Sequence, residues 1–164
     1  MRKRLLLVLF LASGAAHVGS QAPEPNRVAY WPDAELKSVD TNNLSAKAKK
    51  GTAGAEFFLT TAHHQVLMAR RERPGPPELH KAEIDIMIVR TGGGILQVGG
   101  EIVDRKDSAA GATGSSIRGG DRHTLGPGDV INIPANVPHA WLLGPGEQVT
   151  YFLVKVKEPI PSAR

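Results

Sequence analysis

The stretch Gly126–Trp141, GPGDVINIPANVPHAW, sets a short strand between two turns and then leads to a histidine. Its opening Gly-Pro-Gly is typical of a tight turn, because proline fixes φ and glycine adopts conformations that other residues avoid. The VINI run suits a buried strand, and Pro134 ends it because proline cannot donate a ladder hydrogen bond. Asn136 suits a left-handed turn position. The stretch therefore predicts a rigidly held imidazole at His139.

The same stretch resembles the second sequence motif of the cupin superfamily. That motif reads glycine, five residues, proline, any residue, glycine, two residues, histidine, three residues, asparagine. Gly128, Pro134 and His139 fall on it in register. Asn136 replaces the second glycine, and Leu143 stands where asparagine is usual.

Residues 77–92, PELHKAEIDIMIVRTG, resemble the first cupin motif, which is His-any-His, three or four residues, Glu, six residues, Gly. His80 matches the second histidine, Asp85 takes the glutamate position and Gly92 follows, whereas Glu78 stands where the first histidine belongs. The resemblance covers roughly residues 60–156. It implies an all-β fold, a cupin-like antiparallel β-barrel of the jelly-roll or double-stranded β-helix type, whose interior binds a metal or a small molecule.

The resemblance also implies a metal site made of His80, Asp85 and His139, with Glu78 as a fourth ligand. Such a mixed nitrogen and oxygen set suits a divalent metal ion such as manganese, iron, zinc, nickel or copper. Glu83 remains a rival to Asp85, because the turn after His80 could shift the register by two residues. Without a metal, the same cluster would be a polar pocket that recognises its ligand by hydrogen bonds.

The strand around Asp85 decides which side chains face the barrel interior. A period of two places Glu83, Asp85 and Met87 on one face and the isoleucines at 84, 86 and 88 on the other. In a barrel that is covered on both sides, we expect the acids to face the lumen. We therefore predict that Glu83 and Met87 lie in the ligand pocket, together with Trp141 as a wall.

The first 20 residues have the pattern of a secretory signal peptide. A basic start, Arg2 to Arg4, precedes an apolar run that is too short to span a bilayer, and small residues follow it. The chain has no cysteine, which excludes a lipoprotein signal. We expect a periplasmic or secreted protein with no membrane segment in its mature form.

The rest of the chain divides into an N-terminal extension, residues 21–55, and the barrel, residues 56–158. The extension is predicted to carry an edge strand over Arg27–Trp31 and one short helix that ends with Leu44–Lys50. Residues 104–120 are rich in glycine, serine and charge without periodicity, which favours a loop, either a lid or tolerated surface. The predicted barrel strands are residues 57–62, 65–71, 84–90, 95–103, 121–125, 130–133, 140–142 and 148–156.

Charge and composition narrow the possible partners. Three of the 20 basic residues and none of the 16 acids lie in the signal segment, which leaves the mature chain at +1. This net charge does not indicate nucleic acid binding, which needs basic residues clustered on one face. Three functions stay open: a metal-dependent dioxygenase, isomerase or hydrolase acting on a small organic ligand, a non-catalytic small-molecule-binding module without metal, and a structural scaffold. Many short strands leave edges to cover, so a homodimer is expected.

Overall fold

The computed structural model describes residues 28–51 and 53–158. The predicted signal peptide lies outside the described residues. Within these two ranges, no helix is long and apolar enough to cross a membrane. Residues 28–31 form no strand, so the predicted edge strand is wrong for the part of it that is described.

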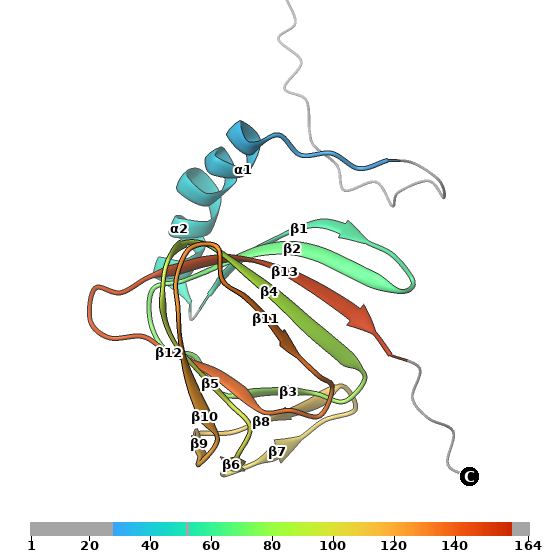
Figure 1. The fold of residues 1–164 in the computed structure, drawn as a ribbon, viewed down its shortest axis with the longest axis vertical. Helices are drawn as coiled ribbons and strands as arrows, with labels where there is room; N and C mark the ends of the chain where they lie inside the picture. The colour runs from blue at the N-terminus through green and yellow to red at the C-terminus, as the bar shows by residue number, and fades with distance from the viewer. Residues whose placement is uncertain (1–27, 52, 159–164) are drawn as a thin grey trace, which may run out of the picture.

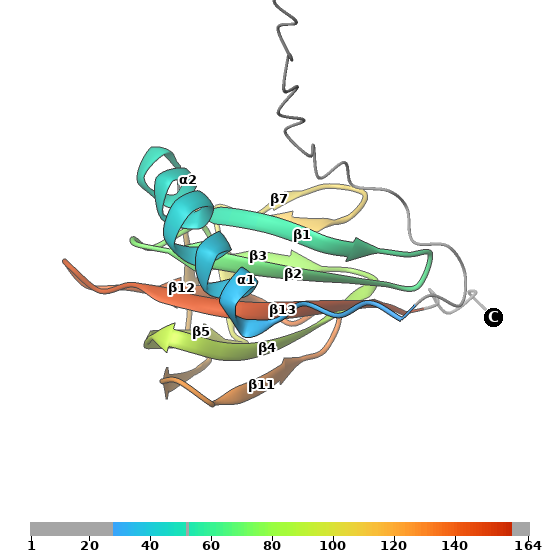
Figure 2. The same ribbon diagram turned by 90° about the horizontal axis from the view of Figure 1, so that it is seen from above.

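A helical segment precedes the barrel and is longer than predicted. It consists of α1 (Asp33–Val39), a π-helical turn η1 (Asp40–Leu44) and α2 (Ser45–Lys50). The first turn carries acids and the last turn carries lysines, an arrangement that complements the helix dipole. The segment packs on the outer face of the barrel near β1 and β2 (Figure 2). Its buried side chains are Leu36, Leu44 and Ala48.

Two antiparallel sheets face each other and form the barrel (Figure 1). The five-stranded sheet has the order β1 (Gly54–Thr60), β2 (His64–Arg71), β13 (Val149–Lys157), β4 (Glu83–Gly92) and β11 (Val130–Ile133). The second sheet has the order β10 (Asp121–Leu125), β5 (Gly94–Val98), β12 (His139–Leu142), β3 (Glu78–His80), β8 (Gly111–Thr113) and β7 (Lys106–Asp107). A separate ribbon pairs β6 (Glu101–Val103) with β9 (Ser116–Arg118).

The main core fills the space between the sheets. Strand β4 shows the predicted alternation: Asp85 and Met87 are buried at 1% and 3% exposure, whereas Ile88 is 37% exposed. The acid-bearing face therefore points into the barrel and the isoleucine face points outward, as the period of two predicted. The buried hydrophobic residues of this core are Leu67, Ala69, Met87, Val89, Leu96, Ile133, Trp141, Leu143, Val149, Tyr151 and Leu153.

Residues 104–120 are not the predicted loop, because they contain β7, β8 and β9. Strand β8 pairs with β3, and it approaches so closely that a Cβ at Gly111 would collide with the carbonyl oxygen of Leu79. Ala112 is buried beside Leu79 and Ile102 in a second small core. Small residues thus make the pairing possible, although they give no alternating pattern in the sequence.

The predicted strand over residues 95–103 is divided by a glycine pair. Gly99 and Gly100 both have positive φ, 80° and 74°, which ends β5 and starts β6 in another ribbon. The short strand β3, which carries Glu78 and His80, is missing from the sequence prediction. Three residues after a proline-rich turn are too few to show a period, and only their pairing with β8 and β12 makes them a strand.

Candidate metal and ligand site

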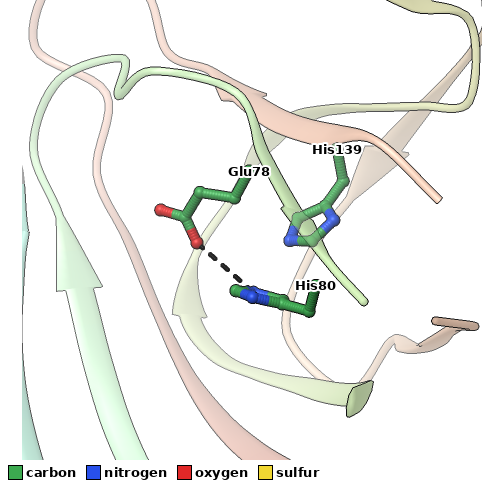
Figure 3. A group of neighbouring side chains, drawn as sticks. All are labelled: Glu78, His80 and His139. Carbon is green, nitrogen blue, oxygen red and sulfur yellow. Dashed lines mark ion pairs between the residues drawn. The ribbon is translucent and has the colours of Figure 1, made fainter. Parts of the chain in front are cut away.

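Glu78, His80 and His139 come together inside the barrel. Each offers one ligand atom, and these atoms all lie within 4.8 Å of one another. Glu78 and His139 are paired residues of β3 and β12, so their side chains leave the same sheet side by side. Figure 3 shows the carboxylate of Glu78 and the two imidazole rings converging, with 3.8 Å between Glu78 Oε2 and His80 Nε2. Two imidazoles and a carboxylate are a donor set that could hold a metal.

The turn before β12 fixes His139, as the sequence predicts. Asn136 has the left-handed φ of 64°, and its backbone N–H donates to the carbonyl oxygen of His80 over 2.7 Å. The Asn136 side chain donates to the carbonyl oxygen of Lys81. The turn is thereby tied to the end of β3, and the two histidines are held in one unit.

His139 is neutral and presents a free lone pair. The side chain is 4% exposed, and burial lowers the pKa of His139 below its ordinary value. Its Nδ1 lies 3.1 Å from the carbonyl oxygen of Val137, so Nδ1–H donates there and Nε2 keeps the lone pair. In the described part of the chain, this buried Nε2 has no hydrogen-bond partner. An imidazole oriented by a backbone carbonyl, with its other nitrogen unpartnered, is the arrangement of a metal-ligating histidine.

Asp85 lies beside the two histidines but is engaged by Lys155 of β13. Lys155 Nζ lies 2.8 Å from Asp85 Oδ1 and 3.0 Å from His80 Nε2. Burial alone would raise the pKa of Asp85, but the neighbouring His80 imidazole and the charge of Lys155 hold that pKa below its usual value. Asp85 Oδ2 is 3.4 Å from His80 Nε2 and 3.6 Å from His139 Nε2. In this structure Asp85 is an ion-pair partner of Lys155 and lies next to the Glu78–His80–His139 group; its role as a metal ligand stays a prediction.

Glu83, the alternative to Asp85 as a predicted ligand, also forms an ion pair with Lys155. Its carboxylate oxygen Oε2 is 3.4 Å from Lys155 Nζ. Glu83 is half-buried and does not line the cavity, whereas the other predicted pocket residues, Met87 and Trp141, do. Sequence reasoning missed Lys155 because its place opposite Asp85 depends on the register between β4 and β13.

A cavity of about 150 Å³ adjoins the group and contains polar side chains at a buried end. Arg71 Nη2 donates to Glu78 Oε1 over 2.8 Å, and Arg71 Nε donates to the Tyr151 hydroxyl over 3.3 Å. Burial raises the pKa of Tyr151, which keeps its hydroxyl protonated. The basic run around Arg71 is therefore divided, because Arg70 turns outward to Asp40 and Glu72 while Arg71 lines the cavity.

Comparison with known proteins assigns neither a family nor an activity to this chain. No family model matches the chain, and neither does any curated protein. A polyketide cyclase, RemF, from Streptomyces resistomycificus is 18% identical over 66% of this chain and 68% of that chain, with a TM-score of 0.47. A Streptomyces nucleoside dehydratase is 12% identical, with 66% and 72% covered and a TM-score of 0.47. A cupin-like protein from Thermotoga maritima is 21% identical, with 63% and 68% covered and a TM-score of 0.46.

These matches are too remote to assign a family or an activity to this chain. The two antiparallel sheets and their strand order show that the chain has the cupin-like β-barrel that its sequence predicts.

The lowered pKa of His139 predicts a loss of stability in mild acid. The folded protein keeps this imidazole neutral while the unfolded chain takes up a proton, so the unfolding free energy falls as the pH drops below 6.5, the ordinary histidine value. Asp85, whose pKa is also lowered, adds a second loss below its ordinary value of 3.8. Urea unfolding in metal-free buffer between pH 7.5 and about 5 measures the first loss.

His139→Gln should flatten this dependence near pH 6, whereas His123→Gln, at an exposed position on β10, should leave it unchanged. An identical pH slope in wild type and His139→Gln would contradict the neutral, buried imidazole.

Proposed function

We propose that this chain is a cupin-like protein that binds a divalent metal ion on Glu78, His80 and His139, and a small organic molecule in the adjoining cavity. The observation that carries the proposal is the buried, unpartnered Nε2 of His139, which faces a carboxylate and a second imidazole within ligand distance of one another. A lone pair left without a hydrogen bond in a protein interior is unfavourable unless something else binds it.

The surrounding contacts support the same donor set. Arg71 holds one oxygen of Glu78, which leaves Oε2 directed toward His80. Lys155 Nζ lies 3.0 Å from His80 Nε2, so a metal ion would bind this nitrogen by displacing the lysine. A bound divalent ion would act as a Lewis acid toward an oxygen of the organic ligand. The ligand would lie against Met87 and Trp141.

One contact favours a second candidate function, a metal-free binding pocket. Lys155 already supplies a positive charge to Asp85 and His80, at 2.8 and 3.0 Å. With this ammonium in place, the carboxylates of the site are balanced by the protein itself. The cavity would then recognise its ligand by hydrogen bonds alone.

Metal analysis separates the two candidates. Protein purified without added metal, and protein reconstituted with manganese, iron, zinc, nickel or copper, is dialysed and examined by elemental analysis. We expect one divalent ion per chain with at least one of these metals. Substoichiometric metal in every preparation would exclude the first candidate and leave the metal-free pocket. The export and the homodimer that the sequence predicts remain part of the proposal and have no bearing on this test.

A further inference from the structure

The end of the cavity opposite the lysine is formed by side chains that donate hydrogen bonds. Arg71, Trp141 and Tyr151 all line the cavity. Trp141 and Tyr151 are buried at 3% and 2% exposure, and the side chain of Arg71 is 11% exposed. Two of them come from neighbouring positions in the packed core, since the rings of Trp141 and Tyr151 lie 5.5 Å apart.

These donors outnumber the acceptors that the protein offers them. Trp141 Nε1 is buried and makes no hydrogen bond of good geometry within residues 28–51 and 53–158, although it lies close enough to the Tyr151 hydroxyl to act against the rise in its pKa. The Tyr151 oxygen accepts from Arg71, and in the same part of the chain its own O–H reaches no acceptor. Arg71 donates one hydrogen bond to a carboxylate acceptor, Glu78 Oε1. Buried donors without acceptors are unfavourable, so this end of the cavity favours a ligand that brings acceptor oxygens.

We propose that this donor end binds the carboxylate of a small organic acid. A carboxylate offers two oxygens with about four lone-pair sites, which matches an indole N–H, a phenol O–H and a guanidinium. The remaining walls include Leu67, Met87 and Leu153, which suit a short apolar body. A cavity of about 150 Å³ is large enough for a molecule about the size of benzene.

The net charge of the side chains that line the cavity is compatible with binding of an anion. Arg71 and Lys155 balance Glu78 and Asp85, so the lining is neutral without a metal and carries an excess of two positive charges with a divalent ion bound. The inference rests on the proposed function, because it names the ligand class of the same cavity. The donor end contacts the metal ligand Glu78 through Arg71, but it does not include His80 and His139. Acid binding is therefore measurable with and without metal.

The test uses isobutyrate and its neutral isostere isobutyramide as probes. The chain has two tryptophans, Trp31 and Trp141, so the Trp31→Phe variant reports Trp141 fluorescence alone. We expect isobutyrate to change this fluorescence saturably and to bind at least about tenfold more tightly than isobutyramide. Equal binding of the two probes, or no binding of isobutyrate to either the chelator-treated or the metal-loaded protein, would overturn the carboxylate assignment.

A second variant locates the binding to the donor end. In the same Trp31→Phe background, Tyr151→Phe keeps the packed ring and removes one donor, and it should weaken isobutyrate binding about tenfold. Tyr30→Phe, at a position that is 80% exposed, is the matched control and should leave binding unchanged. Unchanged affinity in Tyr151→Phe would place the acid elsewhere. If the protein binds isobutyrate but takes up no metal in any preparation, the carboxylate site is supported and the proposed metal site is excluded.

Discussion

Replacing His139 by alanine should lower the affinity for the bound divalent metal by a factor of at least about 100. Changes in residues that only orient a metal ligand already cost 10- to 100-fold, and His139 would be a ligand itself. The fold should survive, because the substitution enlarges a cavity that already exists and removes the unpartnered Nε2 together with a single hydrogen bond, from Nδ1 to the Val137 carbonyl. We expect a stability change of less than about 2 kcal/mol, below the usual range for large core deletions.

Isothermal titration with the metal found in the wild type measures the affinity, and urea unfolding of the metal-free proteins measures the stability. His123→Ala, at an exposed position of β10, is the matched control and should bind metal like the wild type. Retention of wild-type affinity in His139→Ala would remove His139 from the site. A large loss of stability with no metal in the wild type would instead make His139 a packing residue.

Lys155→Met should raise the metal affinity about tenfold or more. The ammonium occupies the side of His80 and Asp85 that faces the group, so an incoming divalent ion is repelled by it and must compete for both residues. Methionine keeps the length of the side chain without its charge. Asp85 Oδ2 already lies 3.4 and 3.6 Å from the two Nε2 atoms, and without Lys155 the whole carboxylate would be available as a ligand.

The same substitution should destabilise the metal-free protein by about 3 kcal/mol, since breaking a buried ion pair by removal of one partner costs roughly 3–5 kcal/mol. The half-exposed Glu83 retains its hydration, whereas Asp85 is left buried and unpaired. Added metal should restore most of the stability. Lys157→Met, exposed on the same strand, serves as the control and should change neither quantity. An affinity for metal that is equal or weaker in Lys155→Met would rule out competition between the lysine and the ion.

Short-range sequence patterns predicted the barrel strands around the site and the position of His139. The Gly-Pro-Gly turn, Pro134 and Asn136 specify a strand and a turn through backbone conformations that few other residues adopt, and the structure has β11, a φ of 64° at Asn136 and a buried His139 there. The alternation on β4 likewise placed Asp85 and Met87 on one face, and the resemblance to a barrel predicted that this face points inward. Turn chemistry and a period of two act over a few residues, so a single sequence contains them in full.

Pairing between distant strands decided the rest. Lys155 faces Asp85 because β13 and β4 pair in one register, and a shift by one residue would turn Lys155 away from the lumen. Strands β3 and β8 exist through their mutual pairing and the missing Cβ of Gly111, neither of which gives a local period. Arg71 differs from Arg70 because successive side chains of β2 point to opposite faces, and only packing tells which face is inside. The sequence thus determined which residues could serve the site, and the tertiary structure decided that a lysine shares it with the predicted ligands.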